Sequence, residues 1–155
     1  MLIEELDKSK HNLGDVKELL AMAVGNPTPE KLTKLLNEFY TSDGRTIFIA
    51  EHNAKIIGVI GIDFTDKPLG FITHLAVLPD VRTQGTGSQL INYVTTSLEL
   101  NKIRAETDQD AVGFYRACEF ETEEIKSQYP GVRRFRCVKN IIASPSSRRS
   151  LQESY

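Results

Sequence analysis

The chain has 155 residues, of which 40% are apolar and 26% are charged, and its formal net charge at pH 7 is −2. A chain of this length fits one domain with one core, and its nearly balanced charge disfavours nucleic acid and anionic membranes as partners. No apolar run approaches the roughly 18 residues of a membrane-spanning helix, and Met1 to Glu5 is acidic where a signal peptide would be basic. We therefore expect a cytoplasmic protein with a single domain over residues 1–140.

The chain contains two cysteines, Cys118 and Cys137, whose separation does not match the spacing of metal ligands. We expect both to be reduced core residues rather than a disulfide or a catalytic thiol. We expect no metal cofactor.

The N-terminal part of the chain predicts a short strand and then a helix. Met1 to Leu6 is the candidate strand, although its acidic residues weaken the pattern. From Asp15, apolar residues recur at helical spacing, and Gly25-Asn26-Pro27 ends the helix. The predicted apolar face consists of Val16, Leu19, Leu20 and Ala23.

A second helix is predicted directly after the first. Thr28 is placed to cap it and Pro29 to occupy its first position, because these residue types favour those sites. Ser42-Asp43-Gly44 ends the helix. Its predicted apolar stripe consists of Leu32, Leu35, Leu36 and Phe39.

After the two helices the apolar period changes to two, which predicts strands. Thr46 to Glu51 and Ile56 to Phe64 form a hairpin through the tight turn His52 to Lys55. After a further turn at Thr65-Asp66-Lys67-Pro68, Gly70 to Leu78 is expected to be the third antiparallel strand. The predicted shared face of the second strand consists of Ile56, Gly58, Ile60, Ile62 and Phe64.

The third strand leads into a glycine turn, Arg82-Thr83-Gln84-Gly85-Thr86-Gly87, and then into a helix. The first turn of a helix has unpaired N–H groups and a partial positive charge, both of which attract anions. Gly85 and Gly87 have no side chain that would keep a phosphate away, and Arg82 can bind a phosphate by two parallel hydrogen bonds. The segment therefore predicts a diphosphate-binding turn. The apolar face of the helix consists of Leu90, Ile91, Val94 and Leu98.

The spacing of the turn separates three kinds of ligand. A mononucleotide P-loop would have a lysine after the glycines, and none is present. The dinucleotide pattern G-x-G-x-x-G has Leu90 at its third glycine. The pattern that matches is R-x-x-G-x-G, with Arg82, Gly85 and Gly87, which resembles the pyrophosphate-binding signature of the GNAT acetyltransferase superfamily. The alternative explanation of the hexapeptide is a glycine turn beside a surface arginine.

Beyond the glycine-turn helix, the pattern predicts a strand, a helix and a closing hairpin. Lys102 to Thr107 alternates with Ile103 and Ala105 inward, and Asp108 is expected to cap the next helix. The residues at helical spacing there are Ala111, Phe114, Tyr115 and Cys118. The closing hairpin consists of Thr122 to Ser127, the turn Tyr129-Pro130-Gly131, and Arg133 to Asn140.

A strand-helix-strand connection joins parallel neighbours, so the sheet is expected to be mixed. Residues 141–155 are rich in Ser and Arg and poor in apolar residues, so we expect a flexible tail.

A second stretch, Ala105 to Phe120, resembles the other GNAT signature, a strand followed by a helix with A-x-x-F-Y. The order of elements over residues 1–140 is similar to the whole GNAT fold. This resemblance implies an α/β (α+β) architecture in which a central mixed, mostly antiparallel sheet of about six or seven strands is flanked by about four helices. Glu119 stands where the family usually has glycine, so we expect the turn before Phe120 to form in another way. Asp108 stands where many members have an asparagine that contacts pantetheine.

The resemblance implies an N-acetyltransferase that moves an acetyl group from acetyl-CoA to a primary amine by direct transfer in a ternary complex. Orientation of the two substrates can lower the barrier by about 7–11 kcal/mol. The strand Leu75 to Val77 would pair with pantetheine and polarise the thioester, and N–H groups from Gln84 to Gly87 would bind the diphosphate with Arg82. The cofactor-binding residues implied in this way are Leu75, Ala76, Val77, Arg82, Thr83, Gln84, Gly85, Thr86, Gly87, Ser88, Asp108, Ala111 and Phe114.

Three residues are candidates for the chemistry. Tyr115 is the candidate general acid, because a phenol with a pKa of about 10 can protonate a thiolate whose conjugate acid has a pKa near 8.5. His74 and Glu106 are the candidate bases, His74 acting directly or through water. Each has a simpler structural explanation: Tyr115 as a core aromatic, His74 as a packed strand residue and Glu106 as an exposed one.

Two other classes of function remain open at the level of sequence: a non-catalytic acyl-CoA-binding sensor or interaction module, and nucleotide-binding regulation. The acceptor is an unidentified small molecule or peptide. Asp43, Glu51 and Asp63 are candidates for attracting a cationic amine, with solvated surface charge as the alternative. A monomer and a homodimer are both compatible with the sequence.

Overall fold

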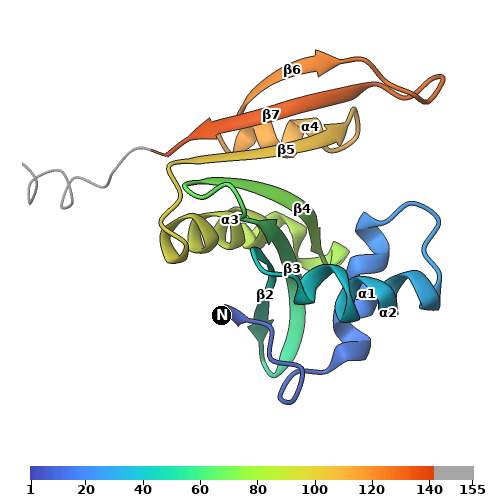
Figure 1. The fold of residues 1–155 in the computed structure, drawn as a ribbon, viewed down its shortest axis with the longest axis vertical. Coiled ribbons are helices and arrows are strands. Elements are labelled where there is room, and N and C mark those ends of the chain that lie inside the picture. Colours follow the sequence, from blue (N-terminus) through green and yellow to red (C-terminus); the bar gives the residue numbers. More distant parts are fainter. Residues whose placement is uncertain (142–155) are drawn as a thin grey trace, which may run out of the picture.

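A computed structural model describes residues 1–141 of the chain (Figure 1). A seven-stranded sheet has the order β1-β2-β3-β4-β5-β7-β6, and β4 and β5 are its parallel pair. The predicted mixed, mostly antiparallel sheet is thereby confirmed. The strands are β1 (Leu2–Glu5), β2 (Arg45–His52), β3 (Lys55–Asp63), β4 (Leu69–Val77), β5 (Lys102–Asp108), β6 (Glu121–Ile125) and β7 (Arg134–Asn140).

Helices flank the sheet, and Figure 1 shows α4 behind β5 and β7. The helices of the described residues are α1 (Leu13–Ala23), α2 (Pro29–Asn37), α3 (Thr86–Ser97) and α4 (Val112–Ala117), with the short 3-10 helices η1 (Phe39–Thr41) and η2 (Pro79–Gln84). No helix within residues 1–141 has the length and apolar character needed to cross a membrane. The predicted tail, apart from Ile141, lies outside the described residues.

The sheet separates two groups of buried apolar residues. The larger group surrounds α3 and α4 and includes Ile60, Leu90, Val94, Ile103 and Cys137. The smaller group surrounds α1 and α2 and includes Val16, Leu20, Leu36 and Val59. Because β3 contributes to both groups, it is buried on both faces. Strands covered on both faces lose the simple alternation of apolar and polar residues.

Helix α1 begins earlier than the sequence pattern predicts. Asn12 precedes it, and the Asn12 side-chain oxygen accepts a hydrogen bond from the Asp15 amide at 3.1 Å. This cap extends the helix N-terminally to Leu13. The prediction that Ala23 is buried is wrong, because Ala23 lies exposed at the last position of the helix.

Helix α2 has the predicted cap. The Thr28 hydroxyl accepts a hydrogen bond from the Lys31 amide at 3.1 Å, and Pro29 is the first helical residue. The helix ends at Asn37, so Phe39 belongs to η1 and not to the stripe of α2. The chain tightens into η1 before it turns into β2.

The predicted common face of β3 is interrupted at one residue. Gly58 faces α3, where a Cβ atom would meet Leu90, and Ile60 and Ile62 belong to the same core group. Ile56 packs instead with the α1 and α2 group. The register against β2 shifts beside Ile56 and leaves Ile57 as an extra residue. A bulge of this kind reverses the side on which the following residues lie.

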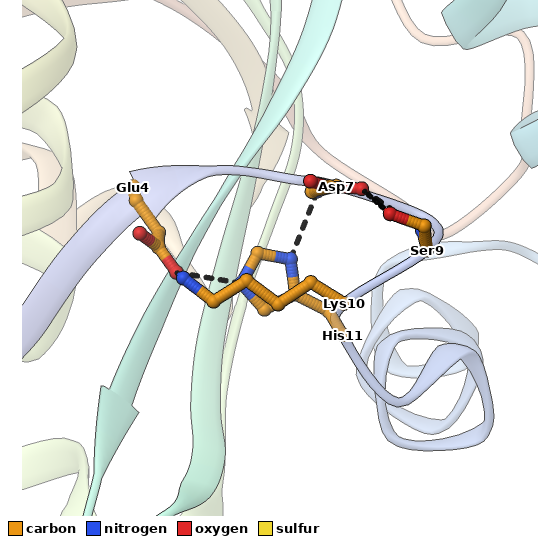
Figure 2. A network of polar contacts seen from close by, with 5 residues as sticks. All are labelled: Glu4, Asp7, Ser9, Lys10 and His11. Carbon is orange, nitrogen blue, oxygen red and sulfur yellow. Dashed lines mark hydrogen bonds and ion pairs between the residues drawn. The ribbon is translucent and has the colours of Figure 1, made fainter.

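A polar network fixes β1 to the start of α1 (Figure 2). His11 is buried, and its Nδ1 accepts a hydrogen bond from the Asp7 amide at 2.8 Å, while Nε2 lies 2.7 Å from a Glu4 carboxylate oxygen. Because the amide must donate, Nδ1 carries no proton and Nε2–H donates to Glu4. Hydrogen bonds from Lys10 and His11 hold the pKa of Glu4 below its usual value.

Helix α4 ends in a turn whose central residue is left-handed. Glu119 has φ +68°, the Phe120 amide donates to the Tyr115 carbonyl at 3.0 Å, and the Glu119 amide donates to the Arg116 carbonyl at 3.0 Å. The Phe120 ring also packs edge-on against Tyr115, with centroids 5.2 Å apart. These are the features of a glycine-ended helix turn. The expectation of a different turn is therefore wrong, because glutamate adopts the conformation usually left to glycine.

Asp108 does not cap α4, contrary to the prediction. It is the last residue of β5, and its carboxylate accepts hydrogen bonds from the Asp110 amide at 2.9 Å and the Ala111 amide at 3.1 Å. The residue that precedes α4 is Ala111 itself. Asp108 therefore stabilises the turn between β5 and α4.

Candidate functional site

The sheet opens between its two parallel strands. Leu69–Phe71 of β4 pairs with Lys102–Arg104 of β5, and the pairing of these strands ends there. On its other side, β4 remains paired with β3 as far as Val77. A cleft of about 760 Å³ lies between the diverging strands. Its walls come from α1, β4, η2, α3, β5, α4 and β7.

A bulge in β4 lies at the point of divergence. Gly61 of β3 is opposite His74 and Ile62 is opposite Ile72, so Thr73 is an extra residue in β4. A bulge bends the strand that carries it and increases its twist. The bend follows directly after the last pair with β5, which explains why the two strands separate here.

One end of the cleft reaches the first turn of α3. Gly85 precedes this helix with φ +78°, a conformation that favours glycine, and the space where its Cβ would lie is open. Gly87 lines the cleft, but a Cβ there would lie 2.9 Å from the Phe114 ring. The close packing of Phe114 on α3 thus requires a glycine at this position, a reason that the sequence analysis did not identify.

Arg82 lies at the wall of the cleft, between β4 and α1. Its Nε donates a hydrogen bond to the Val77 carbonyl at 3.1 Å, and its guanidinium lies 4.0 Å from the Met22 sulfur. The side chain is exposed and lines the cleft. The hydrogen bond to the end of β4 fixes the stem of the guanidinium and leaves other N–H groups to donate.

Tyr115 lines the cleft from α4 and is 6% exposed. Its ring packs edge-on between Phe114, at 5.1 Å, and Phe120. Burial, and then the nearby Cys137 and Cys118, raise the pKa of Tyr115 well above that of a free phenol. The side chain therefore keeps its proton at neutral pH.

His74 and Glu106 face the cleft from opposite strands. His74 on β4 is half-buried, its Nδ1 is hydrogen-bonded to the Tyr40 hydroxyl, and burial lowers the pKa of the imidazole. Glu106 on β5 is exposed and lies opposite Arg136 in the β7 register. The cleft thus brings together the three residues that the sequence analysis named for chemistry.

A family model described as "Acetyltransferase (GNAT) domain" matches residues 43–122. The chain belongs to the GNAT acetyltransferase family. As a GNAT protein it is an acetyl-CoA-dependent acetyltransferase, and the matched segment contains both signatures seen in the sequence. No curated protein matches the chain significantly.

Solved structures of low sequence identity share the GNAT fold. An aminoglycoside 6'-N-acetyltransferase complexed with coenzyme A is 18% identical, with a TM-score of 0.72 and coverage of 94% of this chain and 99% of that one. The ribosomal-protein-S18-alanine N-acetyltransferase from Escherichia coli is 19% identical, with a TM-score of 0.71 and coverage of 93% and 96%. The aminoglycoside 6'-N-acetyltransferase from Enterococcus faecium is 18% identical, with a TM-score of 0.70 and coverage of 94% and 99%. These likenesses concern the fold.

Most of the residues implied by the GNAT resemblance line the cleft. The implied cofactor residues that do so are Leu75, Ala76, Val77, Arg82, Gly87, Asp108, Ala111 and Phe114. Gln84, Gly85, Thr86 and Ser88 do not line it. Thr86 is buried against β3, and Ser88 is half-buried. Thr83 lies within η2. For Gly85 and Thr86, the backbone is what remains to meet a ligand.

Several residues that line the GNAT cleft were not predicted from the sequence, namely Met22, Ala23, Ile72, Thr73, Thr107, Asp110 and Arg134. Ala23 was assigned to a buried face because it fits the helical period, yet it ends α1 beside the cleft. Arg134 lies opposite Asp108 in the register of β5 and β7. No local pattern in the sequence indicates these positions, because each depends on a pairing between distant segments. Residues 1–141 contain no cluster of metal-ligating side chains.

Proposed function

We propose that this GNAT enzyme transfers an acetyl group from acetyl-CoA directly to a primary amine, with both substrates bound at once. The observation that carries the proposal is the divergence of β4 from β5 after Phe71, which opens a cleft lined by Gly87 in the first turn of α3 and by Met22 and Ala23 at the end of α1. A cleft of this kind admits two substrates from two directions. Their orientation supplies much of the rate acceleration.

Coenzyme A would lie along the β4 side of the cleft. The backbone of Leu75 to Val77 has no partner on β5 in the described register, so it is available to pair with the pantetheine amides. The N–H groups from Gln84 to Gly87 and the Arg82 guanidinium would bind the diphosphate. Asp108, Ala111 and Phe114 would form the opposite wall.

The reaction forms a C–N bond and breaks a C–S bond. The amine nitrogen attacks the thioester carbon while a backbone N–H of β4 polarises the carbonyl oxygen. As the C–S bond breaks, Tyr115 gives its proton to the departing sulfur, and its raised pKa keeps that proton in place beforehand. The proton lost by the amine passes to Glu106 or His74, directly or through water.

Three acidic residues of the cleft support a cationic acceptor, and two arginines, Arg82 and Arg134, also line it. Glu106, Asp108 and Asp110 line the β5 side, although the Asp108 carboxylate also accepts two backbone hydrogen bonds. Two similar folds belong to enzymes named for an aminoglycoside and for the alanine of a ribosomal protein, both of which carry a primary amine. We propose an acceptor of one of these classes, an amino sugar or a peptide N-terminus. Because both cysteines are unpaired, we propose a reducing compartment, the cytoplasm.

The test measures binding and turnover separately. Titration calorimetry with acetyl-CoA should detect binding, and release of the CoA thiol should follow when polyamines, amino acids, aminoglycosides or peptides with a free N-terminus are added. Binding without thiol release for any amine would favour a sensor. Preference for ATP or NAD over acetyl-CoA would contradict the proposal entirely.

A further inference from the structure

Tyr40 contacts two residues of the cleft wall although it lies far from them in sequence. Its hydroxyl is 2.6 Å from the Thr73 hydroxyl and is also hydrogen-bonded to Nδ1 of His74. Neighbouring residues of a regular strand point to opposite faces. Because Thr73 is the bulged residue of β4, Thr73 and His74 both reach Tyr40. The bulge thereby creates a three-residue chain of hydrogen bonds ending at the cleft.

A second set of contacts holds Tyr40 in this position. Arg45 lies above the Phe39 ring, with its guanidinium 4.3 Å from the centroid, and its Nε donates to Asp63 at 3.1 Å. The Phe39 ring packs edge-on against Tyr40 at 4.9 Å. On the other side of the ring there is no room for a side chain at position 61, because a Cβ on Gly61 would clash with the Tyr40 hydroxyl. Arg45 of β2, through Phe39, and Gly61 of β3 therefore both restrict the position of the Tyr40 hydroxyl.

Counting protons gives the direction of the hydrogen bonds. Tyr40 has one proton to donate, and its two partners are the Thr73 oxygen and the His74 nitrogen. If Tyr40 donates to Thr73, the Thr73 proton has no protein acceptor among the described residues and can meet only solvent in the cleft. If Thr73 donates to Tyr40 and Tyr40 donates to Nδ1, both hydroxyl protons are bonded. Burial raises the pKa of Tyr40, so its proton is retained.

We propose that Tyr40 is a positioning residue that holds neutral His74 with its proton on Nε2, so that His74 donates a hydrogen bond into the cleft. His74 then has no lone pair facing the substrates. Resting on the proposed function, this assigns Glu106 as the group that receives the amine proton. His74 instead binds an oxygen atom of the acceptor, a hydroxyl or a carbonyl, and orients its amine.

The test is long-range ¹H–¹⁵N NMR of the ligand-free, ¹⁵N-labelled full chain above the pH at which its histidines titrate. His11 is an internal reference, because the Asp7 amide fixes its proton on Nε2 (Figure 2). His74→Gln assigns the His74 signals. We expect His74 to give the same cross-peak pattern as His11. A pattern with the proton on Nδ1 would overturn the proposal.

The variant Tyr40→Phe gives a second, independent measurement. It keeps the ring contacts and removes only the hydroxyl. If Tyr40 donates to Nδ1, its bond exists only with neutral imidazole, so its loss should raise the pKa of His74. If Tyr40 accepts from Nδ1–H, the loss should lower the pKa and overturn the proposal. Thr73→Val is the control and should leave the His74 proton on Nε2. A move of this proton to Nδ1 in the control would also contradict the proposal.

Neither measurement requires a substrate. Failure of the proposed function would appear as absent acetyl-CoA binding, whatever the state of His74. Failure of the present inference would appear in the NMR pattern, whether or not acetyl-CoA binds.

Discussion

The two long sides of β4 differ in what they do. Toward β3, β4 is paired from Phe71 to Val77, interrupted only by the bulge at Thr73. Toward β5, pairing stops after Phe71 and a cleft begins. The backbone groups of β4 on the β3 side are therefore paired within the sheet. Those on the β5 side beyond Phe71 are left available to a ligand. Burial differs in the same direction, because β3 is buried along most of its length whereas the cleft also has exposed walls, such as Arg82 and Glu106.

The largest expected effect is on the paired side. Ile60 of β3 is 0% exposed and packs in the α3 core group. Ile60→Ala should lower the free energy of unfolding by about 2–5 kcal/mol, because it removes buried methylene groups and leaves a cavity. Urea denaturation measures the loss. The matched variant on the cleft side, Leu75→Ala, should lower the free energy of unfolding by less, because Leu75 is only partly buried. Equal losses in the two variants would contradict the difference between the two sides of β4.

Tyr115→Phe should act on turnover and not on binding. Loss of a general acid should slow acetyl transfer roughly 100-fold, while the affinity for acetyl-CoA, measured by calorimetry, should stay unchanged. Burial raises the pKa of Tyr115. The wild-type side chain should therefore remain protonated even at a pH equal to the pKa of a free phenol. Turnover should therefore not fall at pH 10 from loss of this proton. Tyr129→Phe, an exposed control, should leave turnover unaltered.

Arg82→Ala should act on binding. Charge-assisted hydrogen bonds contribute about 1.5–3 kcal/mol, so the affinity for acetyl-CoA should fall about 10-fold to 100-fold. The loss should shrink at high salt, because the contact is exposed. Arg133→Ala removes another exposed arginine, which pairs with Glu124 away from the cleft, and should have no effect. Equal affinity of Arg82→Ala and wild type would remove this arginine from the site.

The smallest expected effect is a gain in stability at the end of α4. Glu119 has φ +68°, which is unfavourable for any residue with a Cβ. Glu119→Gly should raise the free energy of unfolding by about 1 kcal/mol. Glu119→Ala, which keeps the Cβ, should not. Acetyl-CoA binding should be unchanged in both variants. The turn after α4 would then affect the stability of the fold without affecting the cleft.

Local patterns predicted the elements well where one residue type or one period decides the structure. Thr28 and Pro29 gave the start of α2, and the period of two gave the β2–β3 hairpin. The prediction failed at Ile56, at Asp108 and at Ala23. Two of these failures have a non-local cause: a bulge opposite β2 for Ile56, and the position of α1 beside the cleft for Ala23. The failure at Asp108 is local, because its carboxylate binds the amides of Asp110 and Ala111 in the turn before α4 and does not cap the helix.

For the site, the two signatures indicated the family and most of the cleft wall. They did not indicate Thr73 or Tyr40, whose contact with His74 spans 34 residues of sequence. Nor did they indicate why Gly87 is needed, since the answer is the ring of Phe114 on another helix.

The sequence by itself determined the order of strands and helices and the GNAT signatures, because these depend on neighbours within one or two turns of the chain. The tertiary structure alone decided where β4 and β5 separate, which side chains meet in the cleft, and which partner His74 finds. Such features arise when segments distant in sequence compete for the same space and the same hydrogen bonds, and no local period records the result.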